Sequence, residues 1–361
     1  MNIALIITGL GMGGAERQVC DLADQFSELG HQVLLISMTG ETVNQPVSKS
    51  VQVVALKMSK NPFGFIKAYW RARQLIKRFK PDVVHSHMVH ANLFARLLRL
   101  SISIPKLIST AHSSNEGGHI RMFAYRLTDW LCDFNTNVSQ EAVDISVKRG
   151  AAAARRIVVM YNGIDTLRFS FNTLSRKIKR RELGLSSNIT LLLAVGRLTE
   201  AKDYPNLLEA FRIVLKSREK VQLAIIGAGE DQDKLSIMAV ELGIIDSVHF
   251  LGLRHDVHDW MSAADFFVLS SAWEGFGLVV AEAMSCERLV IATDCGGVKE
   301  VIGDAGILVP AKSSAALARG LLQSLALSSD SVAQRGVFAR ERIIKCYSLR
   351  SQTERWLRLY R

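Results

Sequence analysis

Short apolar runs rich in β-branched residues alternate with helical patterns along the whole chain. Such runs are typical of the buried strands of a parallel sheet whose two faces are covered by connecting helices. The first series of runs lies at 3–8, 32–37, 51–55, 82–85, 106–109, 134–137 and 157–160. A second series lies at 190–195, 222–226, 248–251, 266–269 and 289–292. The pattern therefore predicts an α/β protein with two doubly wound, Rossmann-like domains.

A polar and basic stretch separates the two series of runs. It contains NGIDTLRF at 162–169 and SRKIKRREL at 175–183, which we interpret as the crossover and the lead-in to the second domain. The predicted domains are 1–165 and 166–340, with a basic, tryptophan-containing helix over 341–361. Loops at the carboxyl ends of the strands are expected to line a central cleft.

The first run is followed by the glycine-rich loop GLGMGGAERQ. Its Gly9, Gly11 and Gly14 match the G-x-G-x-x-G fingerprint of dinucleotide sites. An NAD site also needs an acidic residue at the end of the second strand, and the first one here, Glu41, lies too far along. We therefore favour a more general phosphate site, at which Gly13 and Gly14 open a helix and expose backbone N–H groups. A glycine turn that only packs helix on strand is the structural alternative.

The second series of strands carries a pair of cations. The loop in LLLAVGRLTEAKDYP places Arg197 and Lys202 directly after a strand. Preset positive charge at such a position stabilises the negative charge that grows on a diphosphate leaving group. The alternative is a pair of solvated loop charges.

A second motif, SSAWEGFGLVVAEAM, follows the run at 266–269. Its turn holds Glu274, whose carboxylate can accept hydrogen bonds from sugar hydroxyls. The backbone N–H groups of Phe276, Gly277 and Leu278 form a helix N-terminus suited to phosphate. Glu282 follows one turn into the helix and can reach a ribose, although alone it would be an ordinary exposed residue.

In their order and spacing these motifs resemble the family-4 glycosyltransferases, which are retaining nucleotide-sugar enzymes with the two-domain B-type fold. The resemblance covers nearly the whole chain and implies that the helix at 341–361 crosses back to the N-terminal domain. It places Gly13 and Gly14 beside the donor diphosphate and makes Arg197 and Lys202 its clamp. Glu274 would hold the donor sugar.

The same resemblance assigns two further residues. Glu282 would hold the nucleotide ribose, and a histidine of the N-terminal domain would lie beside the donor sugar. The matching residue is His112 in LISTAHSSN. The resemblance implies same-face substitution, in which the leaving phosphate helps to deprotonate the acceptor, with no metal and no cofactor.

Composition narrows the setting. The five cysteines are dispersed without C-x-x-C spacing, which is typical of a reducing compartment. We expect neither a secretory signal nor a membrane-spanning segment, and hence a cytoplasmic protein. The net charge of +11 points to an anionic partner. Nucleic acid is disfavoured because no binding motif accompanies the charge.

Three histidines, His85, His87 and His90, invite a metal hypothesis. No carboxylate or cysteine nearby in the sequence completes a ligand set. We favour a cluster at a strand end, with His90 in the following loop.

A basic helix is predicted over 63–80. Its apolar stripe, assigned to the core, consists of Phe65, Ile66, Ala68, Tyr69, Ala72, Leu75, Ile76 and Phe79. Trp70 falls instead among the cations Lys67, Arg71, Lys77 and Arg78, an arrangement that suits an anionic lipid surface. RMFAYRLTDWL at 121–131 is a second candidate. A solvated helix is the alternative.

We therefore expect a retaining hexosyltransferase, peripheral on the inner face of the cytoplasmic membrane. Its donor would be a nucleotide-diphosphate sugar, with UDP favoured by the resemblance alone, and its acceptor a lipid-linked saccharide. Such enzymes build surface polysaccharides such as O-antigen, capsule or exopolysaccharide. The alternatives are a nucleotide-sugar epimerase of the same architecture and an NAD-dependent dehydrogenase.

Overall fold

The computed structural model describes residues 1–59, 61–113 and 119–361. The chain forms two compact units: residues 1–163 together with 349–361, and residues 164–348. The first unit thus takes up a C-terminal segment after the chain has completed the second. The change of unit after Gly163 lies two residues before the predicted boundary.

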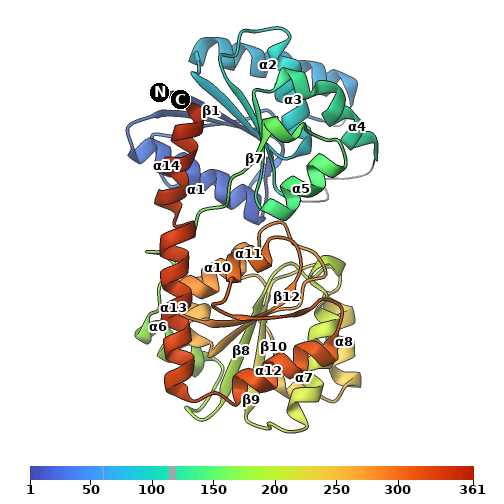
Figure 1. Ribbon diagram of the computed structural model, residues 1–361, viewed down its shortest axis with the longest axis vertical. Coiled ribbons are helices and arrows are strands. Elements are labelled where there is room, and N and C mark those ends of the chain that lie inside the picture. The colour runs from blue at the N-terminus through green and yellow to red at the C-terminus, as the bar shows by residue number, and fades with distance from the viewer. Residues whose placement is uncertain (60, 114–118) are drawn as a thin grey trace. The chain divides into compact units, whose positions relative to one another are not determined.

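The first unit contains a seven-stranded parallel sheet in the order β3-β2-β1-β4-β5-β6-β7 (Figure 1). Its strands are β1 (Asn2–Leu10), β2 (Gln32–Thr42), β3 (Gln52–Ala55), β4 (Val83–His87), β5 (Leu107–Ala111), β6 (Phe134–Asn137) and β7 (Ile157–Val159). Its α-helices are α1 (Gly14–Glu28), α2 (Pro62–Phe79), α3 (Val89–Arg99), α4 (His119–Thr128), α5 (Gln140–Lys148) and α14 (Leu349–Tyr360). Short 3-10 turns lie at Asp129–Leu131 and Ala154–Arg156.

Both faces of this sheet are buried. Ile3, Leu5 and Ile7 of β1 belong to a core with α1 and α14, which lie side by side in Figure 1. Ala4 and Ile6 point to the opposite face, into a core with α2 and α3. Because both faces of the strand are covered, the strand is apolar at nearly every position, and this is the pattern visible in the sequence.

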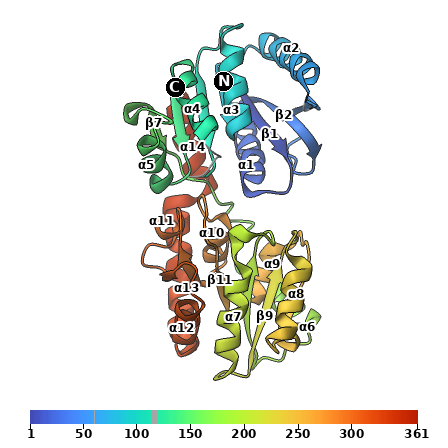
Figure 2. The ribbon, with the colours of Figure 1, turned by 90° about the vertical axis from the view of Figure 1, so that its right-hand side faces the viewer.

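The second unit contains a six-stranded parallel sheet in the order β10-β9-β8-β11-β12-β13 (Figure 2). Its strands are β8 (Thr190–Val195), β9 (Val221–Ile226), β10 (Val248–Phe250), β11 (Phe266–Leu269), β12 (Leu289–Asp294) and β13 (Ile307–Pro310). Its α-helices are α6 (Thr173–Glu182), α7 (Tyr204–Leu215), α8 (Gln232–Glu241), α9 (Val257–Ala263), α10 (Leu278–Ser285), α11 (Val298–Ile302), α12 (Ser314–Leu325) and α13 (Ser329–Tyr347). Short 3-10 turns lie at Glu200–Lys202 and Ile245–Ser247.

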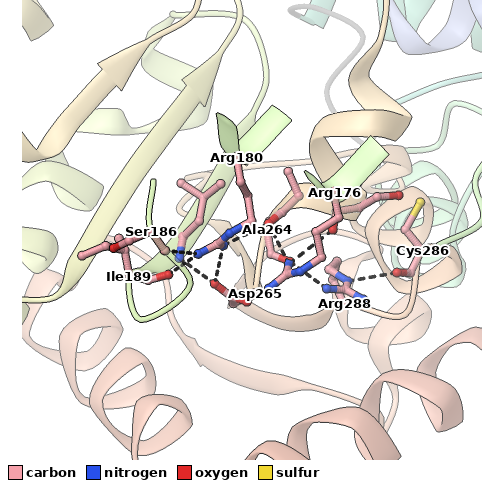
Figure 3. Close-up of polar contacts among 11 residues, drawn as sticks. Arg176, Arg180, Ser186, Ile189, Ala264, Asp265, Cys286 and Arg288 are labelled. Carbon is pink, nitrogen blue, oxygen red and sulfur yellow. Dashed lines mark hydrogen bonds and ion pairs between the residues drawn. The ribbon is translucent and has the colours of Figure 1, made fainter. Parts of the chain in front are cut away.

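Most of the basic stretch at 175–183 lies in the helix α6, which packs on α9. Figure 3 shows two of its arginines, Arg176 and Arg180, pointing toward Asp265. Arg176 Nη2 lies 2.5 Å from Asp265 Oδ1, and Arg180 Nη1 lies 3.1 Å from Asp265 Oδ2. The neighbouring Arg288 donates from Nη1 to the carbonyl of Ala264 at 2.7 Å. Part of the positive charge of the chain is therefore used within the second unit to dock α6.

The predicted helix over 341–361 is interrupted. α13 ends at Tyr347, Ser348 is extended with φ −60° and ψ 143°, and α14 begins at Leu349. The extended peptide breaks the hydrogen-bond ladder of the helix, so the two helices are separate elements. α13 belongs to the second unit, and only residues 349–361 pack on the first.

Each sheet has one place where the order of its strands reverses. In the first sheet this switch point lies between β1 and β4, and in the second between β8 and β11. Ligands of open α/β sheets bind outside the carboxyl ends of the strands at such points. The loops that follow these strands are therefore the first places to look for a site.

Candidate active site

At the switch point of the second unit, the loops that follow β8 and β11 are tied together. The amide of Ala272 donates to the carbonyl of Ala201 at 2.9 Å, and Ser270 Oγ donates to the carbonyl of Lys202 at 2.8 Å. These bonds place the loop of GRLTEAKD beside the turn of SSAWEGFG. Lys202 and Glu274, the charged residues of the two motifs, are 72 residues apart in the sequence, yet their loops form one structural element.

The charged side chains of the two loops meet in an ion pair. Lys202 Nζ contacts Glu274 Oε1, which also accepts a hydrogen bond of 2.8 Å from Ser271 Oγ. The side chains of Lys202 and Glu274 are 18% and 12% exposed. Both bonds go to Oε1, and no described residue donates to Oε2. The carboxylate is therefore held in one orientation with its second oxygen available to a hydroxyl group.

The turn around Glu274 is supported from behind by the glycine pair that follows β12. Gly296 has φ +54°, and a Cβ there would lie 2.0 Å from the carbonyl oxygen of Glu274. The amide of Gly297 donates to the carbonyl of Gly275 at 3.2 Å. This glycine pair therefore packs directly against the backbone of the turn.

The helix α10 begins directly after this turn. Its N-cap residue, Gly277, has φ +83°, a left-handed conformation that glycine adopts without strain. The Phe276 side chain is buried and lies edge-on to Tyr347 at 5.5 Å, so Phe276 can serve a ligand only through its backbone N–H. Leu278 is the first helical residue, and the half-buried Glu282 lies one turn further on.

Arg197 lies at the mouth of β8. Its side chain is exposed and forms no ion pair within the described ranges. The preceding Gly196 is closely packed. A Cβ on Gly227 would lie only 1.9 Å from the Gly196 carbonyl oxygen, and this oxygen accepts a hydrogen bond from Tyr204 Oη at 3.2 Å. Arg197 is therefore an unpaired cation on a fixed backbone.

In the first unit, the glycine loop joins β1 to α1, and Gly13 is the N-cap of that helix. Gly14 is its first residue. A Cβ on Gly13 would lie 2.2 Å from Glu16 Oε2, so the Glu16 carboxylate lies against Gly13. This contact was missed by the sequence analysis. A glutamate at the third helical position commonly reaches back to the N-cap, and this spacing is the signal that could have revealed it.

His112 lies one residue beyond β5 and contacts a histidine at the end of β4. His87 Nδ1 is 3.1 Å from His112 Nε2, and the His87 ring lies 3.9 Å from that of His85. Burial lowers the pKa of His112 to about 4 and that of His85 and His87 well below the usual value. The prediction that His90 lies in a loop is wrong, because it lies in α3. In the described part of the chain no group of His, Cys, Asp and Glu is placed to hold a metal.

The surface of the first unit differs from the predicted stripe. Ala68, Ala72 and Ile76 of α2 are buried, but Phe65 and Ile66 are exposed, because α2 turns only a narrow face to the sheet. Trp70 is 53% exposed, and Arg73 lies over its ring at 5.1 Å. The cations Lys67, Arg71, Lys77 and Arg78 are exposed on the same helix.

A more strongly apolar surface lies on α4 and the turn that follows it. Ile120, Phe123, Leu127 and Trp130 are 63% to 87% exposed and recur at helical spacing, so they form one stripe. Arg121 and Arg126 are exposed beside it. No helix in the described ranges is long and apolar enough to cross a lipid bilayer.

The predicted site residues thus fall in two groups. The second unit carries Arg197, Lys202, Glu274, Phe276, Gly277, Leu278 and Glu282, and its switch point brings together the two loops that follow β8 and β11. The first unit carries Gly13, Gly14 and His112, at the ends of β1 and β5. Two neighbours, Ser271 and Glu16, were not identified from the sequence, and His87 was expected at a strand end but not in contact with His112.

Comparison with known proteins agrees with this architecture. Residues 12–168 match the family described as Glycosyltransferase Family 4, and residues 175–341 match Glycosyl transferases group 1. The chain is 25% identical to the lipopolysaccharide core biosynthesis glycosyltransferase LpsE of Rhizobium meliloti, covering 96% of this chain and 95% of that one. The fold is similar to that of Anabaena HepE in complex with UDP, with a TM-score of 0.85, 20% identity and 99% of each chain covered.

A third relative is named for the reaction it performs. It is the N-acetylgalactosamine-N,N'-diacetylbacillosaminyl-diphospho-undecaprenol 4-alpha-N-acetylgalactosaminyltransferase of Campylobacter jejuni, 25% identical over 89% of each chain. Taken with the two parallel sheets and the motifs at their switch points, these matches show that the chain belongs to the family-4 glycosyltransferases of the B-type fold.

Proposed function

We propose that the protein transfers a hexosyl group, with retention of configuration, from a nucleotide-diphosphate sugar to a lipid-linked saccharide. The observation that carries the proposal is the orientation of Glu274, whose Oε1 is held by Lys202 and Ser271 while Oε2 receives no described bond. A carboxylate held in this way is suited to bind sugar hydroxyl groups. UDP is the favoured nucleotide, since Anabaena HepE binds UDP and UDP-glucose.

The reaction follows from the charges at the switch point of the second unit. The bond between the anomeric carbon and the β-phosphate oxygen breaks, and Arg197 and Lys202 stabilise the charge that develops on the phosphate. The acceptor hydroxyl bonds to the same face of the anomeric carbon. Its proton passes to the leaving phosphate, so a second carboxylate on the opposite face is not needed. We assign the ribose to Glu282 and the phosphates to the N–H groups of Phe276, Gly277 and Leu278.

The first unit is proposed to contribute Gly13, Gly14 and His112. Burial keeps His112 neutral at physiological pH, since its pKa is about 4. We therefore assign His112 a hydrogen bond to the donor sugar and not the role of a general acid. The Glu16 carboxylate against Gly13 must move away from the N-terminus of α1 before a diphosphate can bind there, because two anionic groups repel each other.

The lipid-linked acceptor is proposed from the Campylobacter relative, whose name includes diphospho-undecaprenol. Such an acceptor lies at a membrane. We propose that the protein binds the cytoplasmic face of an anionic membrane, with the cations of α2 and the apolar stripe of α4 as the contact surface. The exposed Ile120, Phe123, Leu127 and Trp130 support this proposal, because soluble proteins rarely expose a continuous apolar stripe of this kind.

The site is tested by substitution of Glu274. Glu274→Gln keeps the size of the side chain but removes the negative charge. The side chain then no longer forms the ion pair with Lys202 and is a weaker acceptor for sugar hydroxyl groups. We expect kcat/KM for the nucleotide sugar to fall by about 10²–10³-fold. Glu282→Ala is expected to act chiefly on the KM of the donor. Steady-state release of UDP from UDP-sugars in the presence of acceptor measures both.

The matched control is Glu241→Gln, a surface change in the same unit that should leave the kinetics unaltered. A thermal shift with UDP verifies that the variants still fold and bind nucleotide. Full activity of Glu274→Gln would refute the assignment.

A further inference from the structure

An open groove lies in the second unit, beside the loops that carry Lys202 and Glu274. It has a volume of about 400 Å³, which is within the range of about 300–1,000 Å³ found for small-ligand sites. Its lining comes from the loop before α7, the first turns of α7, the turn after β11, α8 and the start of α12. Neither Lys202 nor Glu274 is among its lining residues. The groove is therefore distinct from the candidate donor site.

The charged side chains of the groove are mostly acidic. Glu200, Asp203 and Glu209 contribute three carboxylates, and Lys312 contributes one ammonium group. Burial raises the pKa of Asp203, and the nearby charge of Lys312 opposes this rise. In the ranges that the structure describes, no group of acidic residues is placed to hold a metal ion. The excess of negative charge disfavours a phosphate ligand, whereas carboxylates accept hydrogen bonds readily from hydroxyl groups.

An exposed indole ring lies at the groove. Trp273 is 44% exposed, and its ring forms no aromatic contact with another described residue. The amide of the preceding Ala272 donates to the carbonyl of Ala201 at 2.9 Å, so the backbone that carries the indole is fixed. The flat apolar face of an indole suits the C–H face of a sugar ring, and its N–H group can donate to a hydroxyl.

A buried amide gives a second and independent indication of a ligand. Asn206, in the first turn of α7, lines the groove and is only 9% exposed. Its Nδ2 is buried and has no hydrogen-bond partner in the described part of the chain. A buried polar group without a partner destabilises the free protein and calls for an explanation. A hydroxyl group both donates and accepts, so it can satisfy the amide through its nitrogen or its oxygen.

We propose that this groove binds a neutral saccharide, with one sugar ring against Trp273 and its hydroxyl groups bonded to the carboxylates and to Asn206. The inference adds a saccharide site outside the donor site and does not depend on the identity of the donor. Trp273 directly precedes Glu274, and Asp203 directly follows Lys202. A saccharide in the groove therefore contacts the same two loops that form the ion pair.

The test follows Trp273 directly in the full chain. ¹⁹F spectra of protein labelled with 5-fluorotryptophan should contain one resonance for each of the five tryptophans, and Trp273→Phe assigns the resonance of interest. The probes are the disaccharides maltose, cellobiose, lactose and N,N′-diacetylchitobiose. We expect at least one of them to shift the Trp273 resonance in a saturable way. The shift should persist in Glu274→Gln, because Glu274 does not line the groove.

Asn206→Leu separates ligand binding from a structural role. The substitution removes the unpartnered amide at nearly constant volume, so Tm should stay the same or rise. The Kd of the saccharide should nevertheless increase by about three- to tenfold, since a hydrogen bond to the ligand is lost.

Filling the groove provides a second variant. Met238 of α8 lines the groove, and Met238→Tyr should abolish the shift. The matched control is Ile237→Tyr at the neighbouring position of α8, which is 59% exposed and does not line the groove. It should leave the Kd unchanged. Asn206→Leu remains decisive where Met238→Tyr fails to fold.

Three results would overturn the proposal. They are an unmoved Trp273 resonance with all four disaccharides, an unchanged Kd in Asn206→Leu, and a shift that is lost in Glu274→Gln but kept in folded Met238→Tyr. The third result would place the saccharide in the donor site.

The source of the saccharide is then determined by mass spectrometry, after incubation with a nucleotide sugar that the protein turns over. An elongated disaccharide identifies the ligand as part of the acceptor, and an unchanged one as a saccharide held outside the reaction. Either result follows from a groove that binds saccharide. Failure of the proposed function is a separate outcome, in which no nucleotide sugar is turned over while the Trp273 shift remains.

Discussion

At the scale of single residues, the most informative groups are those whose partners come from another strand. Lys202 and Glu274 could each be identified from a local motif, because glycine turns after strands have a recognisable pattern. Their ion pair could not, since it depends on β8 and β11 being neighbours in the sheet. The bond between His87 and His112 depends in the same way on the pairing of β4 with β5.

The buried histidines predict a sensitivity of stability to acid. The unfolded chain takes up protons on histidine near pH 6.5, whereas burial lowers the folded pKa of His112 to about 4 and holds that of His85 and His87 well below its usual value. The stability that the folded state has with these histidines neutral is fully present above pH 6.5 and is lost as the pH falls toward 4. Each histidine that stays neutral in the folded state lowers the free energy of unfolding by about 1.4 kcal/mol for every unit by which the pH falls through this window.

Urea unfolding at pH 7.5, 5.5 and 4.5 measures this slope. His112→Gln should reduce the slope by the share of one histidine. Equal slopes in the two proteins would show that His112 is not buried neutral in the folded state.

At the scale of elements, the sequence located nearly all strands, because buried parallel strands are continuous apolar runs. β13 was missed, since it is a partly exposed edge strand that ends in Pro310. The predicted core stripe of α2 was only partly correct: most of it packs on the core, but Phe65 and Ile66 are exposed. Phe65 and Ile66 fit a helical stripe, but a helix at the edge of a layer buries only a narrow part of such a stripe, and only tertiary packing decides which part.

The glycine loop after β12 gives a prediction at this scale. Gly296→Ala would place a Cβ 2.0 Å from the carbonyl oxygen of Glu274 at a positive φ, so the turn must move. A displacement of about 1 Å at a positioned group can cost on the order of 10²-fold in rate. We expect kcat/KM to fall accordingly while the protein stays folded.

Gly243→Ala is the control, because Gly243 has φ +67° with no atom near its added Cβ. It should lose about 1–2 kcal/mol of stability from backbone strain and no activity. Equal activity of the two variants would contradict the supporting role of Gly296.

At the scale of the whole molecule, charge and exposed apolar surface lead to a prediction about membranes. The net charge is +11, while Arg176 and Arg180 are already paired with Asp265. We expect the protein to bind vesicles that contain phosphatidylglycerol, more weakly at high salt and weakly to purely zwitterionic vesicles. Vesicle flotation at two salt concentrations measures this.

Two double variants separate the contributions to that binding. Phe123→Ser with Trp130→Ser removes half of the apolar stripe of α4, and Lys67→Ala with Trp70→Ala tests α2. Each should reduce binding without loss of activity on a soluble acceptor. Leu167→Ser changes an equally exposed apolar residue of the second unit and serves as control. Unchanged flotation of both double variants would remove the membrane proposal.

The division of the chain has a consequence for the order in which the protein matures on the ribosome. Residues 349–361 belong to the first unit but are synthesised after all of the second. Until they emerge, the core that receives Trp356 and Tyr360 stays open, and His85 lacks its phenol partner. Because domains generally fold as they are made, the second unit is free to complete its fold first. The cluster of His85, His87 and His112 is thus completed in one of the last steps of folding.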